Sequence, residues 1–574
     1  TGANVATVVN ALIDEQESNL ISSTLAEAVA DTTLVVGMSR RISDRAGATF
    51  KVITKGSVDH VDKPNTFSIV ECTGVNTLAL SLEYDNTLFV KRFGAKGDRS
   101  ANDTQAMLYV MSRLADYSTL RFDGAVCNID DNLYIENIKG LSILGDGGGL
   151  YKAGGSTLFT NPMMQFSGCD DLSINGVLIE GSFAGSAIDA GDYGLRVLSG
   201  ERVEISGNTF KNLGDSAWTV ASASGGTAGK TQSKDVTVTG NIFDNVWQVS
   251  TTGNSGGVIG YTFSSNICNM KGAVKFASRS DNAKNLIISD NVIVSETSAG
   301  IELVGYVDVL ITNNTIDGKT YGINAYVNTL SEAATSPLEN IKVESNIITS
   351  ETKPCVRVNT QLSALDPYNY TGFSIKNNTL TRTDELDTAT AIAFVGDGFD
   401  GVVIEGNNIK GGITYFYDRA PNNLITFDKG VTVRGNTARH ASADSTPFIY
   451  GAGTEIPHLS IIDNDVVSTG GLLYLNTNVA VLNDNLVITG NTVQSEAGVI
   501  DAGFGNSHII KGNRLTSTTT SVELLKSSAT NVYLSDNIFE TARTGRAARL
   551  DYAAMTFDGG GNVLPSTATV SYYG

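Results

Sequence analysis

The sequence is short of charge, proline and uninterrupted apolar runs, and each shortage removes a class of structure. Charged residues make up 17% of the 574 residues and proline only nine, which is not the composition of a disordered chain or of a coiled coil. No apolar run approaches the roughly 18 residues of a membrane-spanning helix, so we expect no membrane insertion. With 60 glycines and 41% hydrophobic residues, the sequence instead favours a turn-rich, well-packed β protein.

Cysteine is also scarce, and its spacing indicates neither a disulfide framework nor a metal site. The five cysteines, Cys72, Cys127, Cys169, Cys268 and Cys355, are an odd number, widely separated and without CxxC pairs. We therefore expect them to be buried as small apolar side chains. The sequence leads us to expect no metal and no other cofactor.

Basic residues are outnumbered, with 40 Lys and Arg against 60 Asp and Glu, a net charge of −20. Binding of nucleic acid depends on Lys and Arg that neutralise phosphates, so we expect no nucleic-acid partner. The first residues also lack the basic and apolar regions of a signal peptide. Because the chain begins with Thr1 rather than Met, we expect that upstream residues have been removed.

The most informative feature is a repeat of the form apolar, any residue, apolar, two residues, asparagine, usually with another apolar residue two places later. Its asparagines are Asn208, Asn241, Asn266, Asn291, Asn314, Asn346, Asn378, Asn407, Asn436, Asn464, Asn491, Asn513 and Asn537. These thirteen copies follow one another at intervals of 22 to 33 residues. Self-similarity at such a period indicates a repeat architecture.

Each repeat describes one coil of a solenoid. Apolar residues at i and i+2 belong to a strand with one buried face, and the asparagine before a second short strand marks a sharp turn. Asparagine tolerates left-handed backbone angles, and its amide can bond to the equivalent asparagine of the next repeat. A single coil cannot bury its own apolar face, so coils stack into a continuous core. The fixed short period of a leucine-rich repeat is absent.

A third strand lies between successive asparagine turns, preceded by glycine or proline. It begins near Gly272, Gly300, Gly322, Pro354 and Gly471. Three short strands per coil give a roughly triangular cross-section. We therefore predict an all-β protein, a right-handed parallel β-helix with about thirteen asparagine-ladder coils.

A capping element precedes the first coils. Residues Val90 to Asp116 contain Ala106, Met107, Val110 and Leu114 at helical spacing, with Asp103 as a plausible N-cap. A short amphipathic helix here would cover the open end of the solenoid, where unpaired backbone groups would otherwise invite aggregation.

The segment FGAKGD followed by NDTQA resembles the motif that opens the β-helix in the pectate-lyase-like superfamily, which includes many phage tailspikes and polygalacturonase-related proteins. The region ahead of this motif looks like the small neck domain of tailspikes. On this basis we expect four parts. Residues 1–89 form an N-terminal neck or particle-proximal domain, 90–135 a strand, loop and capping helix, 136–565 the parallel β-helix and 566–574 a C-terminal tail.

The resemblance to tailspikes implies a function and partners. Tailspikes of this kind are homotrimers that bind capsular or O-antigen polysaccharide, and many cleave it. The chain would attach to the phage tail or baseplate through the removed N-terminal region. It would be made in the host cytoplasm, form part of the virion and act at the bacterial cell surface.

The glycine-led strands offer a candidate site, because their outward positions carry more than Thr, Ser and small residues. One residue per coil gives a row of Lys275, Glu302, Asn324 and Arg357, with Val304, Tyr326 and Asn359 two places further on. A carboxylate beside cations, an amide and an aromatic ring is what sugar binding and acid–base cleavage require. Glu302 is the first candidate catalytic residue.

Hydrolysis needs a second carboxyl group near Glu302. The best candidates are Asp281 and Glu332, with Asp308 less favoured, and a trimer could supply a carboxylate from another subunit. Two long insertions, at Val327–Asn340 and Asn359–Gly372, would wall a groove here. Candidate substrate-binding residues are Lys275, Arg279, Asn324, Tyr326, Arg357, Asn359, Tyr368 and Tyr370, with Tyr415 and Tyr417 as further aromatic faces.

Other interpretations stay open from the sequence alone. Glu302 and Lys275 can form a simple cross-strand ion pair, and the tyrosines can be packing contacts. A polysaccharide lyase would use a Lys, Arg or Tyr base with a cation that neutralises a uronate, for which Lys275, Arg279, Arg357 and Tyr326 are available. A third possibility is a fibre that binds polysaccharide without cleaving it.

Overall fold

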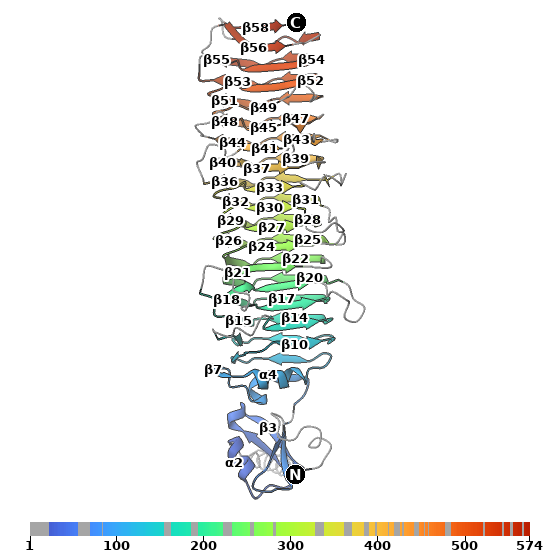
Figure 1. Ribbon diagram of the computed structural model, residues 1–574, viewed down its shortest axis with the longest axis vertical. Helices are drawn as coiled ribbons and strands as arrows, with labels where there is room; N and C mark the ends of the chain where they lie inside the picture. The colour runs from blue at the N-terminus through green and yellow to red at the C-terminus, as the bar shows by residue number, and fades with distance from the viewer. Residues whose placement is uncertain are drawn as a thin grey trace, which may run out of the picture.

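The computed structural model is an elongated column of stacked coils, with the chain termini at opposite ends (Figure 1). It describes residues 22–55, 69–82, 84–153, 162–184, 193–221, 232–252, 258–278, 283–327, 338–360, 370–383, 390–396, 399–410, 413–417, 425–426, 430–440, 447–452, 454–456, 458–476, 484–519, 523–541, 545–551, 555–564 and 568–573.

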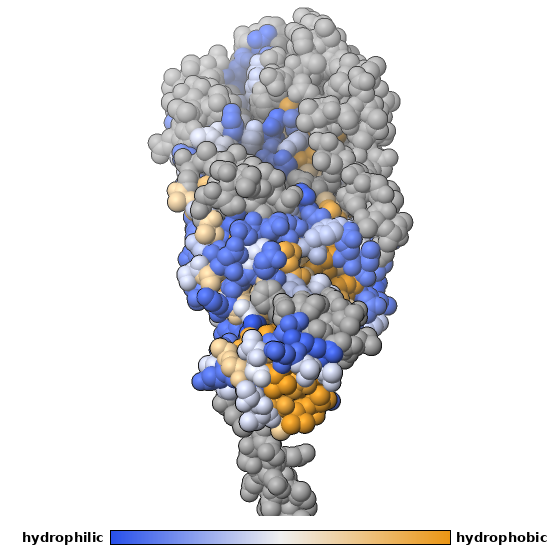
Figure 2. Space-filling view, turned by 60° about the horizontal axis from the view of Figure 1, so that its bottom comes forward, coloured by the Kyte–Doolittle hydropathy of each residue, from blue (hydrophilic) through white to orange (hydrophobic). Residues whose placement is uncertain are grey.

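A small sheet forms the N-terminal end. Its strands lie in the order β1 (Ser22–Ser23), β2 (Ser39–Ile42), β3 (Ala48–Thr54), β5 (Leu78–Leu82) and β4 (Ile69–Glu71), beside helix α2 (Leu25–Ala30). Its core includes Phe50 and Leu80, both fully buried. An apolar area is visible at this end of the molecule (Figure 2), and the described residues here with exposed large apolar side chains are Val35, Val36 and Met38.

Helix α4 (Thr104–Met111) lies at the start of the solenoid, where the sequence predicts a capping helix (Figure 1). It follows β6 (Thr87–Phe89), the 3-10 helix η2 (Val90–Phe93) and β7 (Asp98–Asn102), and it precedes β8 (Thr119–Arg121) and β9 (Val126–Asn128). Asp103 stands at the N-cap position, but its carboxylate does not cap the helix. It accepts the backbone N–H groups of Lys96 at 2.7 Å and Gly97 at 2.9 Å and so fixes the preceding FGAKG loop.

Each coil contributes three short parallel strands, as predicted. One coil consists of β25 (Lys284–Ser289), β26 (Val292–Ser295) and β27 (Ile301–Val304). The next coil, β28 (Val307–Thr312), β29 (Thr315–Gly318) and β30 (Ile323–Tyr326), pairs with it strand by strand in parallel. Parallel crossovers of this kind are right-handed in nearly all proteins. The chain is a right-handed parallel β-helix.

The asparagine ladder is continuous. Asn346 donates its side-chain N–H to Asn378 Oδ1 at 3.0 Å, and its own Oδ1 accepts the amide N–H of Asn314 at 3.0 Å. The ladder has one member more than the sequence pattern predicts, because Asn537 bonds in the same way to Asn562.

Asparagine tolerates the left-handed conformation, but the ladder asparagine is not the residue of the turn that adopts it. The residue before it does so, for example Asn313 with φ 56° and Ser345 with φ 59°. The asparagine side chain is buried, and it bonds to backbone groups of its own and the neighbouring coils, as Asn346 does to the carbonyl oxygens of Ile311 and Glu344.

Glycine is required at the start of the third strand because a larger side chain has no room there. A Cβ on Gly322 would lie 2.1 Å from Ile348 Cγ2 and 2.6 Å from the carbonyl oxygen of Cys355 in the next coil. The chain passes so close to its neighbour here that no larger residue fits.

The core runs the length of the solenoid and is filled by one layer of side chains per coil. Phe210, Phe243 and Phe263 stack on successive coils, with ring centroids 4.7 and 6.1 Å apart. The five cysteines are all buried in the core as free thiols, as predicted. Burial alone raises the pKa of the Cys268 thiol, so this group stays protonated and behaves as an apolar filler.

The second strands carry an exposed apolar stripe. It consists of Ile242, Ile267, Val292 and Ile347, which are 43, 52, 46 and 56% exposed, with Thr315 between the last two in register. These residues lie on β21 (Ile242–Thr252), β23 (Ile267–Met270), β26, β29 and β32 (Ile347–Ser350). This outward row is therefore mainly apolar and does not consist of Thr, Ser and small residues.

Candidate functional site

The candidate site lies on the face formed by the third strand of each coil. From Glu302 onward these strands are β27, β30, β33 (Val356–Asn359), β37 (Thr390–Val395), β41 (Ile413–Tyr417), β45 (Ile449–Ala452) and β49 (Leu473–Asn476), followed by the first residues of β52 (Ile500–Lys511) and β54 (Leu525–Ser535). β24 (Val274–Ala277) precedes them. Parallel pairing places one residue of each strand in a vertical line about 4.8 Å apart.

One such line, here called the outer row, contains the predicted site residues. Its members in order are Lys275, Glu302, Asn324, Arg357, Ala393, Tyr415, Tyr450, Tyr474, Asp501 and Lys526. The register therefore aligns residues that are far apart in the sequence, since Lys275 and Lys526 are separated by 251 positions. The sequence predicts the first four members as one row and Tyr415 as a separate aromatic face, and the structure places Tyr415 and the other later members on the same line toward the C-terminus.

Glu302 lies between two polar neighbours. Its Oε2 is 3.2 Å from Lys275 Nζ on the preceding coil and accepts a 3.5 Å hydrogen bond from the hydroxyl of Tyr326 on the following coil. The Glu302 side chain is 20% exposed and that of Lys275 31% exposed. The carboxylate is thus largely withdrawn from water but open on one side to a ligand.

The surroundings of Glu302 change the acid–base behaviour of its neighbours. Burial by itself would lower the pKa of Lys275, but the charge of Glu302 and the contact with Tyr326 outweigh it and hold that pKa above its ordinary value. Burial raises the pKa of the Tyr326 phenol, and the Glu302 charge raises it further. At neutral pH the lysine is therefore charged and the tyrosine is neutral.

Asn324, directly above Glu302 in the outer row, is only 8% exposed. Its Oδ1 has no hydrogen-bond partner among the described residues. An unpaired buried acceptor costs about 1–3 kcal/mol unless something supplies a donor. A ligand hydroxyl or amide at this position would do so.

Arg357, one coil further, is held in place by an aromatic ring. Its Nη1 donates to the hydroxyl of Tyr321 at 3.1 Å, and its guanidinium carbon lies 5.3 Å from the centre of the same ring. Asn359 lies two residues later on the same strand and is half-buried. Lys275, Arg357 and Asn359 thus flank the Glu302 carboxylate along the face.

Two predicted positions have a different environment from the one expected. Val304 was expected to point outward but is buried, only 2% exposed. Asp308 lies in β28 with φ 57°, and its carboxylate accepts a 2.9 Å hydrogen bond from the side chain of Asn340 on the next coil.

Several predicted site residues are not described by the structure. Arg279, Asp281, Glu332 and Tyr368 lie outside the described residues. For Tyr370, Tyr415 and Tyr417 only the strand position is described, in β34 (Tyr370–Thr371) and β41, and not the side chain. The second carboxyl group and the loop aromatics therefore stay predictions.

Two hollows were not foreseen from the sequence. One, of about 280 Å³, lies on the outer row and includes Tyr474, Asp501, Glu523 and Lys526 in its lining. The strand that carries Tyr474 was recognised from Gly471, and Tyr474 stands three residues after this glycine, as Lys275 does after Gly272. Asp501 likewise stands three residues after Gly498, whereas no glycine marks Lys526.

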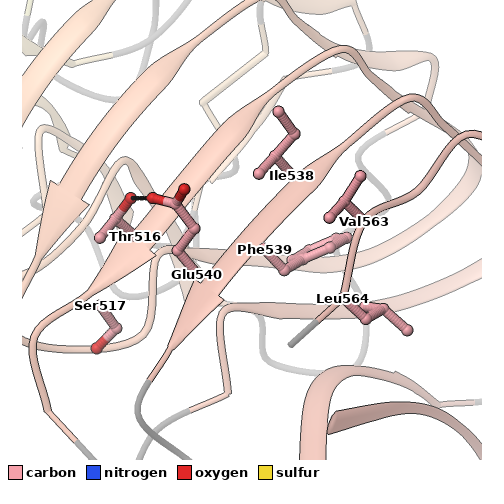
Figure 3. A pocket seen from close by; sticks show the side chains of 7 residues that line it. All are labelled: Thr516, Ser517, Ile538, Phe539, Glu540, Val563 and Leu564. Carbon is pink, nitrogen blue, oxygen red and sulfur yellow. Dashed lines mark hydrogen bonds between the residues drawn. The ribbon is translucent and has the colours of Figure 1, made fainter. Parts of the chain in front are cut away.

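The other hollow, of about 470 Å³, lies near the C-terminal end and is lined by Thr516, Ser517, Ile538, Phe539, Glu540, Val563 and Leu564 (Figure 3). Its carboxylate is fully engaged. Glu540 accepts from the Thr516 hydroxyl at 2.9 Å and pairs with Arg514 at 2.9 Å. The hydrogen bond from Arg514 lowers the pKa of Glu540, so this carboxylate is not a proton donor at neutral pH.

The described part of the chain holds no group of three or more His, Cys, Asp or Glu side chains arranged to bind a metal ion. None of its helices is long and apolar enough to cross a membrane.

No family model matches the sequence, and no curated protein matches it either. Solved structures similar to the chain include PfbA, a surface adhesin of Streptococcus pneumoniae, with a TM-score of 0.43 and 15% identity over 66% of this chain and 92% of that one. They also include the enzymatically active domain of bacteriophage CBA120 tailspike protein 2, with a TM-score of 0.38 and 11% identity over 85% of this chain and 64% of that one.

A third similar structure is the tailspike protein gp49 from Acinetobacter baumannii bacteriophage Fri1, a capsular polysaccharide depolymerase. Its TM-score is 0.30 at 11% identity, over 83% of this chain and 73% of that one. At these identities the matches assign the chain to no family.

Proposed function

We propose that this protein is a phage tailspike that binds and cleaves a bacterial surface polysaccharide, most simply a capsular one, by glycosidic hydrolysis. The observation that carries the proposal is the Glu302 carboxylate, held between Lys275 at 3.2 Å and Tyr326 at 3.5 Å on an outward row of the solenoid. The unpaired Oδ1 of Asn324 on the next coil supports a ligand at the same place.

In this proposal Glu302 acts as the ionised carboxylate of a pair, as general base or as nucleophile. The ammonium group of Lys275 stabilises its negative charge. The proton donor is a second carboxylic acid, for which Asp281 and Glu332 stay the candidates within this chain. Lys275, Asn324 and Arg357 would bind hydroxyl or carboxylate groups of the sugar on either side of the scissile bond.

Elimination by a lyase mechanism is the second candidate, because a tyrosine and two cations lie together in this site. A lyase base must lose its proton, and the raised pKa of Tyr326 opposes this. The same property keeps the Tyr326 hydroxyl protonated at neutral pH, so that it donates a hydrogen bond to Glu302. Hydrolysis is therefore the function that the described side chains support better.

The experiment is incubation with purified capsular polysaccharides from a panel of strains, followed by mass spectrometry of the products. Hydrolysis adds one water per cut, whereas elimination adds none and creates a double bond that absorbs ultraviolet light. Glu302→Gln should lower the rate at least about a hundredfold. Glu405→Gln is a control, since Glu405 also contacts a lysine, Lys376 at 3.4 Å, but lies on a different strand face.

An unchanged rate in Glu302→Gln would remove Glu302 from the mechanism. Binding with no fall in polymer viscosity for any polysaccharide would instead indicate a non-catalytic fibre.

The exposed apolar stripe supports a homotrimer as part of this proposal. Contiguous exposed apolar surface marks interaction sites, and Ile242, Ile267, Val292 and Ile347 are each more than 40% exposed. Because the stripe runs parallel to the solenoid axis, a second copy alongside with a parallel axis can cover it over several coils. In a trimer with three copies around one axis, the apolar stripe of every copy is covered by a neighbouring copy.

In the same proposal, the N-terminal end attaches the protein to the phage tail or baseplate, and the protein acts as part of the virion at the bacterial surface. An N-terminal sheet distinct from the solenoid suits this arrangement, because the solenoid face stays free for the polysaccharide.

A further inference from the structure

The outer row carries a second group of chemistry-bearing side chains far from Glu302. Glu302 and Tyr474 are six coils apart along the registered strands, which is about 29 Å at the usual strand spacing. The Glu302 site does not extend over this distance, so the two groups are separate.

Two tyrosines on neighbouring coils form the first part of this group. The rings of Tyr450 and Tyr474 are stacked, with centroids 5.4 Å apart and planes inclined by 15°. Both side chains are half-buried, so each keeps some surface in contact with solvent. Stacking on Tyr450 fixes the orientation of the Tyr474 ring before any ligand arrives, which lowers the entropic cost of binding against it.

The next two coils supply the polar part. Asp501 follows Tyr474 in the outer row, and Lys526 follows Asp501. Lys526 Nζ lies 3.2 Å from Asp501 Oδ2, and the two side chains remain 42 and 28% exposed. The ion pair fixes the carboxylate while leaving oxygen atoms and ammonium hydrogens available to hydroxyl groups.

A hollow of about 280 Å³ lies over these residues, bounded by Tyr474, Asp501 and Lys526 and by the turns that carry Gly470, Gly498 and Glu523. Gly470 and Gly498 have no side chains to fill the space, so the hollow is open beside the Tyr474 ring. Its volume is near the lower limit of small-ligand pockets and fits one monosaccharide. An apolar ring face next to paired hydrogen-bonding groups is the arrangement that a pyranose requires, because its C–H and hydroxyl groups point in different directions.

We propose that this hollow is a binding site for a neutral pyranose residue of the polysaccharide, separate from the site at Glu302. The charges favour a neutral sugar. The described lining has two carboxylates, Asp501 and Glu523, and one ammonium group, Lys526, so it repels a uronate. The inference rests on the proposed function in so far as the sugar belongs to the polymer that is cleaved. A chain lying along the solenoid axis would occupy both sites and be held during cleavage.

The first experiment uses methyl α-glucopyranoside, its 2-acetamido analogue and methyl α-glucuronoside as probes, with binding followed by ligand-observed NMR on the full chain. We expect binding of at least one neutral pyranoside, and about tenfold weaker binding in Tyr474→Ala. Tyr474→Phe should retain binding, and Asp501→Asn should weaken it. Tyr134→Ala is the matched control, because Tyr134 is 45% exposed on β10 (Leu133–Glu136), at the other end of the same face.

Equal binding by Tyr474→Ala and the unmodified chain, or preferential binding of the glucuronoside, would overturn the inference. Circular dichroism of the Tyr474→Phe and Tyr474→Ala proteins shows whether a loss of binding comes from misfolding, and only a loss in a folded variant supports the site.

The second experiment separates this site from catalysis. With a polysaccharide that is cleaved, Tyr474→Ala should raise KM and leave kcat unchanged, while Glu302→Gln should lower kcat and leave pyranoside binding at Tyr474 unchanged. If no polysaccharide is cleaved but pyranoside binding depends on Tyr474, the proposed catalysis fails and this inference stands. If cleavage occurs and Tyr474→Ala alters neither KM nor pyranoside binding, the inference fails alone.

Discussion

Replacement of one ladder asparagine tests the physical account of the fold most directly. Asn346 is 1% exposed. Its Nδ2 donates to the carbonyl oxygens of Ile311 at 2.9 Å and Glu344 at 3.0 Å and to Asn378 Oδ1 at 3.0 Å. Its Oδ1 accepts the backbone N–H and the side-chain N–H of Asn314, at 2.9 and 3.0 Å. Alanine at this position removes every one of these bonds.

The cost follows from which groups are left without partners. The backbone N–H of Asn314 becomes a buried donor with no acceptor, which costs about 1–3 kcal/mol, and each remaining lost bond costs about 0.5–1.5 kcal/mol where water cannot replace it. Some of the carbonyl groups keep a strand partner, so we expect a total of about 4 kcal/mol rather than the full sum. This corresponds to roughly a thousandfold change in a local opening equilibrium.

Hydrogen exchange followed by mass spectrometry is the suitable assay, because a solenoid opens locally and each coil is stabilised mainly by its neighbours. In Asn346→Ala, peptides that contain Asn314, Asn346 and Asn378 should exchange roughly a thousandfold faster. Peptides around Asn491 and Asn513 should keep their rates and act as an internal reference.

Asn269→Ala is the matched substitution, because Asn269 is exposed on β23 and its amide makes only a 3.4 Å contact with Asp244. It should cost less than about 0.5 kcal/mol. If Asn346→Ala changed exchange no more than Asn269→Ala does, the ladder would not be a major source of stability.

Two further predictions concern association and pH. Ile267→Lys combined with Ile347→Lys should convert the trimer into a monomer in sedimentation experiments. Ile287→Lys, at a 41% exposed position on β25, should leave the trimer intact. A monomeric unmodified chain would refute the trimer. Lys275 has a raised pKa in the folded state, so its contribution to stability is complete below the ordinary lysine pKa and is lost as the pH rises through the higher folded value. The difference in urea midpoint between the unmodified chain and Lys275→Met should therefore shrink in strongly alkaline solution, and a difference independent of pH would contradict the assigned contact.

The candidate site was predictable to the extent that it follows the coil period. Val274, Ile301 and Ile323 are the first inward apolar residues of their strands in register. Aligning them places the residues that follow, Lys275, Glu302 and Asn324, in one line, and the register has them there. Counting does not give side-chain directions or contacts. The sequence shows neither that Val304 is buried nor that Asn324 Oδ1 has no hydrogen-bond partner among the described residues.

The sequence by itself determined the coil. Alternating apolar residues and a periodic asparagine are local signals, and they specify three strands, a turn and stacking because no single coil can bury its apolar face. Tertiary structure decided which outward residues of distant coils meet beside one hollow or in one stripe. Asp501, Lys526 and Tyr474 come from three coils with different loop lengths, and only parallel registration brings them together beside one hollow. The same registration aligns Ile242, Ile267, Val292 and Ile347 into one exposed stripe. The alternation of buried and exposed residues runs along each strand, so it can be read from the sequence. The neighbours of an exposed residue lie on other coils, and no local sequence pattern specifies them.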